Sequence, residues 1–418
     1  MPDNAASLFT ALFLLALALA TGLRLWLALR QMRHVSAHRA LVPAEFAANF
    51  SLDDHQKAAD YTLAKGRVGL IDLAIDTLLL LAFTLGGGLQ WLDTICRGLF
   101  ASSYSQGLAL FAGMGVVSFI IGLPLSLYRT FVIEARFGFN KMTPALFIAD
   151  LAKSTLLTVL IGAPLLLAVL WLMEAMGGRW WLYVWLVWLG FNLLVLLLYP
   201  TLIAPLFNKF SPLPEGPLKE RIEALLARCG FGSAGLFVMD GSKRSAHGNA
   251  YFTGFGKGRR IVFFDTLIDK LTPSEIESVL AHELGHYKLR HIWKRLGLMA
   301  ALSLGFLWLL GQVIDAPWFY QGLGVGQPGT AMALILFSLV LPVFLFPLAP
   351  LTSGLSRQHE FEADAYAAQQ ASGTDLVTAL TKLYRDNAAT LTPDPLHSLF
   401  YDSHPPAAIR VARLQTVA

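Results

Sequence analysis

Long apolar runs dominate the pattern of hydrophobic and polar positions along this chain. Each run approaches the ~20 residues that a helix needs to cross a bilayer. We expect seven spans, at about 8–29, 69–92, 107–127, 156–176, 180–203, 296–314 and 331–351. Every span must be helical, because lipid offers no hydrogen-bond partner to the backbone groups of a loop.

Basic residues sort between alternate loops. Six of them lie between the first two expected spans, whereas none lies between Asp315 and Ala331. By the positive-inside rule, the N-terminus lies outside and the C-terminus lies in the cytoplasm. The leader before the first span has no basic residue, so we interpret that span as a signal anchor. The two large polar segments, 204–295 and 352–418, then face the cytoplasm.

This pattern predicts four parts of the chain: spans one to five in 1–203, a polar insert in 204–295, spans six and seven in 296–352, and a C-terminal segment in 353–418. Composition agrees, since 55% of the residues are hydrophobic and 14% are charged, against roughly 25% charged in ordinary soluble domains. The net charge of +4 follows the topology, so we expect no nucleic-acid partner. Cys96 and Cys229 fall on opposite sides of the membrane and cannot pair.

The sequence pattern of the insert predicts a folded segment of both helices and strands. Apolar spacing predicts a helix over 218–229 and a strand over 235–240. The runs 249–255 and 259–265 are aromatic and β-branched, and the turn Gly256-Lys257-Gly258 between them indicates a hairpin. Thr272, Pro273 and Glu275 then form a capping box that begins a helix.

That helix carries the sequence His282-Glu-Leu-Gly-His286. Residues four apart share a helix face, so both histidines can bind one zinc ion. Glu283 is rotated by roughly 100° and is suited to act as a general base on a water. An accidental match on a solvated helix is the alternative, and a third ligand is needed to decide. Ile292 stands where a metzincin has its third histidine, and we expect His291 to cap the helix at the membrane surface.

A second acidic stretch, 356–367, follows the last expected span. Glu360 and Asp364 share a helix face, whereas Glu362 points elsewhere. Such a stretch is often only a solvated helix face. Together with the two histidines it becomes the best candidate in the chain for completing a zinc site, with one carboxylate as ligand and another holding a histidine. Three protein ligands leave one position for water, from which Glu283 can remove a proton.

Several motifs occur together in one order and spacing. They are His-Glu-Leu-Gly-His, Glu360-Phe-Glu-Ala-Asp364, Asn249-Ala250-Tyr251-Phe252, and Ser403-His404-Pro405-Pro406 followed by Arg410. In this the chain resembles the type I CAAX prenyl proteases, which are integral-membrane zinc endopeptidases. The resemblance covers essentially the whole chain.

The resemblance implies one Zn²⁺ per chain, with Glu360 as its third ligand and Asp364 as the partner of a ligand. It implies that Asn249, Ala250 and Tyr251 bind substrate backbone along an edge strand. It also implies that His404 and Arg410 line the site, with His404 stabilising the oxyanion. The fold class we expect is a mainly α membrane protein of seven spans, with a cytoplasmic zincin-like α+β protease domain.

Two positions depart from the family. Thr253 stands where an aromatic residue is usual, and Glu362 where glutamine is usual, which leaves the substrate preference open. The tail shows no endoplasmic-reticulum retrieval signal, and this favours a bacterial inner-membrane member. We expect peptide or protein substrates, prenylated or membrane-associated ones included, and the lipid bilayer as partners; the sequence carries no signal for an oligomeric state.

Two other functions compete with this interpretation. One is an intramembrane site-2-type protease, but the charged Glu275, Glu277 and Lys288 around the motif argue against it. The other is a transporter or scaffold with a structural zinc, which would not need Glu283. Asp72 and Asp76 in the second span are expected to line a watery chamber rather than to carry protons or substrate. His247 is either a substrate contact or a hydrogen-bonded loop histidine.

Overall fold

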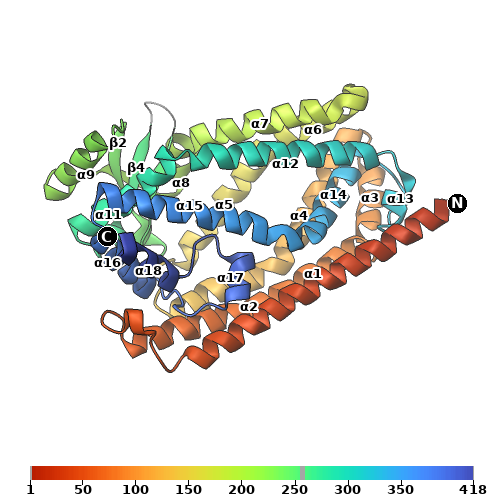
Figure 1. Ribbon diagram of the computed structural model, residues 1–418. Helices are drawn as coiled ribbons and strands as arrows, with labels where there is room; N and C mark the ends of the chain where they lie inside the picture. The colour runs from red at the N-terminus through yellow and green to blue at the C-terminus, as the bar shows by residue number, and fades with distance from the viewer. Residues whose placement is uncertain (1, 255–258, 418) are drawn as a thin grey trace.

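The computed structural model describes residues 2–254 and 259–417. Long helices form a bundle, and a small sheet with shorter helices gathers at one end of it (Figure 1). The chain begins at the opposite end of the bundle and ends beside the sheet. The polar segments of the sequence therefore come together, although two long apolar helices separate them along the chain.

Six helices in the described residues are long and apolar enough to cross a membrane. They are Asn4–His38, Ser103–Glu134, Pro144–Ala175, Gly177–Phe207, His291–Val313 and Thr330–Gln370. A bent pair, Leu52–Phe83 with Gly88–Leu99, is a seventh if it counts as one span. The prediction of one unbroken helix over 69–92 is wrong: the two parts meet at 54°. The break falls at consecutive glycines, and Gly87 has a φ of 75°, which other residues rarely adopt.

Ten α-helices of the described residues make up the bundle. Their bounds are α1 (Pro2–His38), α2 (Leu52–Phe83), α3 (Gly88–Leu99), α4 (Ser103–Tyr128), α5 (Pro144–Leu157), α6 (Ala163–Ala175), α7 (Trp180–Leu198), α12 (His291–Val313), α13 (Pro317–Gln321) and α14 (Thr330–Leu345). Helix α1 packs against α2, α13 and α14, and α7 packs along α12. Buried apolar side chains such as Phe13, Leu170 and Ile335 form one core across these helices, α5 excepted.

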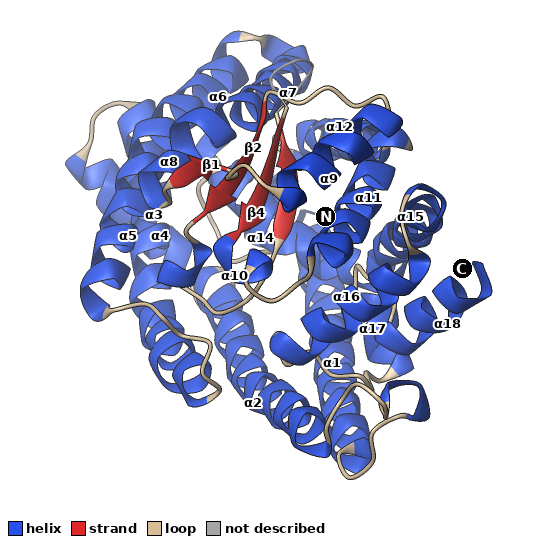
Figure 2. Ribbon diagram, turned by 90° about the vertical axis from the view of Figure 1, so that its left-hand side faces the viewer, coloured by secondary structure: helices blue, strands red, loops and turns tan. Residues whose placement is uncertain are grey.

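The sheet has four strands in the order β1-β2-β4-β3. Their bounds are β1 (Phe210–Pro212), β2 (Gly235–Met239), β3 (Ala250–Thr253) and β4 (Arg260–Phe264). Strands β2 and β4 run parallel, and the other neighbours are antiparallel. The predicted strand at 235–240 and the antiparallel pairing of the hairpin are confirmed, while its predicted turn lies outside the described residues. Figure 2 shows the sheet enclosed by helices, with β3 at its edge.

In the part of the chain that the structure describes, eight further helices complete the polar end. They are α8 (Ala204–Phe207), α9 (Pro217–Arg228), α10 (Asp265–Ile268), α11 (Pro273–Lys288), α15 (Ala349–Gln370), α16 (Gly373–Asp386), α17 (Pro395–Tyr401) and α18 (Ala407–Val417). The helix predicted over 218–229 is confirmed as α9. The capping box is confirmed as well, since Thr272 accepts from the amide of Glu275, whose carboxylate accepts from the amide of Thr272.

Helices α11 and α15 cross closely at Gly285. A Cβ atom at this glycine would lie 2.9 Å from Cα of Ala363 and 3.1 Å from its carbonyl oxygen. The same surface of α11 buries Leu280 and Leu284 in the core of the polar end. Because this contact joins one helix of the insert to one helix of the C-terminal segment, it brings His282 and His286 opposite Glu360 and Asp364.

Candidate metal centre

Three side chains converge where α11 and α15 cross. Nε2 of His282 lies 3.3 Å from Nε2 of His286 and 3.4 Å from Oε2 of Glu360. Nε2 of His286 lies 3.3 Å from Oε1 of Glu360. In the described residues this is the one cluster of histidine, cysteine and acidic side chains with the geometry to hold a metal ion.

These separations fit a zinc ion. Zinc takes nitrogen and oxygen ligands at about 2.0–2.1 Å in a tetrahedron, which puts ligand atoms about 3.3–3.4 Å apart. Oε2 of Glu360 is buried without a hydrogen-bond partner among the described residues, so a cation would satisfy an otherwise costly oxygen. Three protein ligands leave one tetrahedral position for water or substrate, as in catalytic rather than structural zinc sites.

Asp364 and Arg410 lie on the side of His282 that faces away from the convergence point. Oδ1 of Asp364 lies 2.8 Å from Nδ1 of His282, the ring nitrogen that faces away from the convergence point. Nε and Nη2 of Arg410 donate to the two oxygens of Asp364 at 2.9 and 2.6 Å. Burial by itself would lower the pKa of His282, but the neighbouring carboxylates of Asp364 and Glu360 raise it to about 9. The surroundings therefore favour positive charge at this position.

Glu283 lies on the same turn of α11 and contributes no atom to the convergence point. Burial raises the pKa of its carboxyl, and the neighbouring His282 and His286 oppose that shift. Among the described residues, no hydrogen-bond donor holds its carboxylate. A carboxylate with free lone pairs and a raised pKa has the properties of a general base.

His404 and Arg410 come from the far C-terminal segment, as the motifs predict. Nε2 of His404 lies 3.5 Å from Oε1 of Glu360, and its side chain is 60% exposed on the open side of the cluster. Nδ1 of His404 contacts the hydroxyl of Ser403 at 3.0 Å. Arg410 is placed differently, since it is buried and its Nη1 lies 3.7 Å from Oε2 of Glu360. Its contacts are with the site's acids rather than with the open side.

The segment Asn249-Ala250-Tyr251 lies at the free edge of the sheet. The carbonyl of Asn249 accepts from the amide of Phe264 at 3.0 Å, so this residue extends the pairing of β3 with β4 by one position. Ala250 is buried, whereas Asn249 is exposed. The outer edge of β3 pairs with no other described strand, and β3 contacts α11. An extended peptide can add to such an edge.

His291 is not a surface cap, contrary to the sequence-based expectation. Its side chain is 2% exposed, with Nδ1 2.9 Å from Nδ1 of His286 and Nε2 2.9 Å from Oε2 of Glu362. Arg290 adopts a φ of 58°, and this left-handed residue ends α11 and turns the chain straight into α12. The turn swings His291 back against the cluster. Spacing along one continuous helix cannot reveal such a contact.

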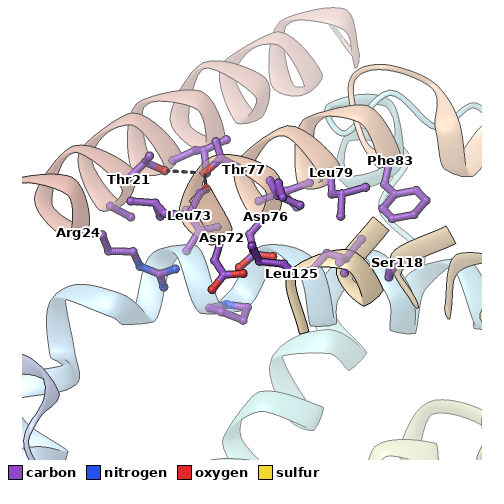
Figure 3. A pocket seen from close by; sticks show the side chains of 18 residues that line it. Thr21, Arg24, Asp72, Leu73, Asp76, Thr77, Leu79, Phe83, Ser118 and Leu125 are labelled. Carbon is purple, nitrogen blue, oxygen red and sulfur yellow. Dashed lines mark hydrogen bonds between the residues drawn. The ribbon is translucent and has the colours of Figure 1, made fainter. Parts of the chain in front are cut away.

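Asp72 and Asp76 lie far from the metal cluster in the sequence, on one face of α2. They line a cavity of about 340 Å³ between α1, α2, α4 and α14 (Figure 3). Asp72 pairs with Arg129, and the cavity also receives Arg24 and the hydrogen-bonded Thr21 and Thr77. This arrangement agrees with acids that line a polar space inside the bundle.

His247 has the contacts of a hydrogen-bonded loop residue. Its ring stacks on Phe139 at 4.3 Å, and its Nδ1 contacts Oδ1 of Asn387 at 3.2 Å.

Helix α11, which carries the metal motif, is absent from the candidate spans of the described residues. A site-2-type arrangement would need that helix to cross the membrane. Cys96 and Cys229 are both free.

Two family models match consecutive parts of the chain. Residues 31–209 match the model described as CAAX prenyl protease N-terminal, five membrane helices. Residues 212–418 match the model of peptidase family M48. Together they cover nearly all of the sequence and meet where β1 begins.

Relatives with assigned names are similar over most of their length. The chain is 36% identical over 396 residues to the CAAX prenyl protease 1 homolog of Oryza sativa, covering 91% of this chain and 92% of that protein. It is 32% identical over 442 residues to the human homolog, covering 94% and 92%. The crystal structure of S. mikatae Ste24p superposes with a TM-score of 0.90 at 30% identity, over 98% of this chain and 99% of that one.

Proposed function

Because this chain belongs to the CAAX prenyl protease family of M48 peptidases, we propose that it cuts membrane-associated proteins near their C-termini at the cytoplasmic face of its membrane. It is a multi-pass membrane protein and a zinc metalloendopeptidase of the Ste24 type. One observation carries the proposal for its site: His282, His286 and Glu360 converge with tetrahedral spacing beside Glu283.

One zinc ion per chain would be held by His282, His286 and Glu360. When bound, zinc lowers the pKa of a water and polarises the scissile carbonyl. Asp364 holds the ring of His282 through its Nδ1, and Arg410 fixes the orientation of Asp364. This support is of the kind that tunes ligand strength in zinc enzymes generally.

Glu283 acts as the proton carrier in this proposal. Its carboxylate takes a proton from the attacking water and passes it to the leaving amine of the peptide. His404 stands on the open side, 3.5 Å from Glu360, from where its ring can donate to the oxygen that becomes negative. The substrate backbone pairs with the edge of β3 at Asn249, Ala250 and Tyr251.

Family membership supports a prenylated C-terminal CAAX sequence as substrate, from which a tripeptide would be removed. The distribution of basic residues supports a cytoplasmic site formed by 204–295 and 353–418, with 1–203 and 296–352 as the membrane parts. The bacterial inner membrane stays a prediction from the tail sequence. The relatives described above are eukaryotic.

A cleavage assay on the full chain in detergent tests this function. A farnesylated CAAX peptide and its unmodified counterpart are incubated with wild type, with chelator-treated enzyme and with Glu283→Ala. We expect wild type to release the tripeptide, and we expect chelator and Glu283→Ala to abolish release. Zinc binding without cleavage of either peptide would overturn the proposed substrate class.

The metal assignment needs its own variant. Glu360→Ala should lose both zinc and activity, whereas Glu220→Ala, which removes an exposed acid on α9, should retain most of its activity. Cleavage by Glu360→Ala at unchanged zinc occupancy would show that the third ligand is a different residue.

A further inference from the structure

The two histidines of the motif are supported in different ways. Nδ1 of His282 faces a carboxylate directly, 2.8 Å from Asp364. Nδ1 of His286 faces another imidazole, 2.9 Å from Nδ1 of His291. That second ring in turn contacts a carboxylate, since Nε2 of His291 lies 2.9 Å from Oε2 of Glu362. His286 is thus linked to a carboxylate through the ring of His291 and not by direct contact. We call His286, His291 and Glu362 the relay.

Hydrogen-bond roles along this relay follow from its terminal group. An ionised carboxylate only accepts hydrogen bonds, so Nε2 of His291 must carry a hydrogen and donate a hydrogen bond to Glu362. Glu362 also accepts from Nε2 of Gln358 at 3.0 Å and faces Nζ of Lys294 at 3.8 Å, as an ionised acid should. Neutral His291 then has a bare Nδ1, which can only accept.

The proton between the two rings therefore belongs to His286. Its Nδ1 donates to Nδ1 of His291, and its Nε2 keeps a free lone pair. That lone pair faces Nε2 of His282 and Oε1 of Glu360, at 3.3 Å from each. The opposite tautomer would carry a proton into the convergence point and could not bind a cation.

The surroundings of His291 hold its ring in the plane that this relay requires. The side chain is 2% exposed, and its ring stacks on His359 with centroids 4.0 Å apart and planes 9° apart. The left-handed backbone of Arg290 delivers the ring to this place. Such a conformation is uncommon for a residue with a Cβ, and it persists where the surrounding structure requires it.

From these contacts we propose that His291 and Glu362 are positioning residues that fix the tautomer and ring orientation of His286. The inference rests on the zinc site of the proposed function, but it concerns metal affinity and not substrate. A glutamine at position 362 could also accept from His291 through its amide oxygen. The relay therefore depends on an acceptor at this position rather than on its charge.

Zinc affinity of the purified full chain, measured by competition with a chromogenic chelator, tests the relay. We expect His291→Leu to weaken zinc binding about 10–100-fold, as loss of a ligand's supporting partner does. His291→Asn places an amide oxygen near the position of Nδ1 and should recover most of this loss. The matched control is His359→Phe, which keeps a ring against His291 and should bind zinc as the wild type does.

Glu362 gives a second pair of variants at a position 35% exposed, where folding is less at risk. Glu362→Gln should bind zinc nearly as the wild type does, whereas Glu362→Leu should bind roughly 3–10-fold more weakly. The visible spectrum of the cobalt-substituted protein should change with Glu362→Leu and not with Glu362→Gln.

Equal affinities of His291→Leu and wild type would overturn the relay, and so would equal losses in His291→Leu and His291→Asn. If His291→Leu fails to fold, indistinguishable Glu362→Leu and Glu362→Gln would overturn it instead. These readouts need no substrate. A protein that cuts no CAAX peptide yet shows the expected zinc affinities would refute the proposed substrate and leave the relay standing.

Discussion

Acidic side chains occur in two settings in this molecule, and the settings differ in how their charge is compensated. At the metal centre, the side chains of Asp364 and Arg410 are 4% and 5% exposed and share two hydrogen bonds. In the bundle cavity, Asp72 is 34% exposed beside Arg129 at 46%, and Asp76 has no partner among the described residues. The acid of the first cluster is buried and paired, whereas the acids of the second are partly exposed.

The difference between the two clusters lies in how completely the charge of each acid is paired and buried. Burying an ion costs several kcal/mol unless geometry and hydrogen bonds compensate it, and the two hydrogen bonds from Arg410 compensate Asp364 in this way. Where solvent fills the cavity, as the sequence predicts, a half-exposed pair contributes typically about 0–1 kcal/mol. Substitutions should therefore have large effects in the first cluster and small ones in the second.

Glu283→Gln should have the largest effect. The amide keeps the shape of the side chain but cannot accept the proton of the attacking water, so kcat should fall about 10²–10⁴-fold. Peptide cleavage by high-performance liquid chromatography measures the rate, and zinc content should stay at the wild-type level. A variant that retains wild-type kcat would remove Glu283 from the chemistry.

Arg410→Met should come next, because it leaves the carboxylate of Asp364 buried and unpaired. Removing one partner of a buried pair costs about 3–5 kcal/mol. Thermal and denaturant unfolding of the metal-free protein measure this loss. The double variant Arg410→Met with Asp364→Asn should recover part of the stability, and no recovery would mean that the two residues are not coupled.

His404→Ala should lower kcat by about 10²–10³-fold if its ring stabilises the oxyanion. KM for the peptide should change little, since the contact strengthens only in the transition state. The neighbouring Ser403→Ala, which removes only a hydroxyl contact with the ring, is the matched control. A rise in KM with kcat unchanged would assign His404 to substrate binding instead.

The pH profile should show the burial of Glu283. Since burial raises the pKa of this carboxyl above 4.5, the base becomes protonated and inactive at a higher pH than an exposed glutamate would. The value of kcat/KM should therefore fall about tenfold per pH unit below that raised pKa. Zinc content is followed in the same samples, and an acid limb centred at or below pH 4.5 in fully loaded enzyme would contradict the assignment.

Asp76→Asn should have the smallest effect, within about 0.5 kcal/mol in stability and about twofold in activity. The same holds for Asp72→Asn, apart from its pairing with Arg129. A loss as large as that of Glu283→Gln would erase the contrast between the two settings and make the cavity a second functional site, which is the default expectation for acids at membrane depth.

Local sequence signals carried part of this picture. The i,i+4 spacing of His282 and His286 and the capping box at Thr272 are properties of one helix, so they could be predicted without the fold. Glu360 comes opposite them only because α12 and α14 return the chain to the same end, and no local signal contains that. His291 shows the limit most clearly, since its place depends on a single left-handed residue between two helices.

The contact between α11 and α15 at Gly285 gives one letter of the motif a meaning that its chemistry does not supply. Residue 285 supplies no zinc ligand. Here it faces Ala363 at a distance where no side-chain atom fits. Because glycine has no side chain, α11 and α15 can approach closely, and this approach sets the distance from His282 and His286 to Glu360. A sequence with both histidines and the glutamate but a larger residue at position 285 would hold α11 and α15 farther apart. The histidines on α11 and Glu360 on α15 would then not converge on one ion.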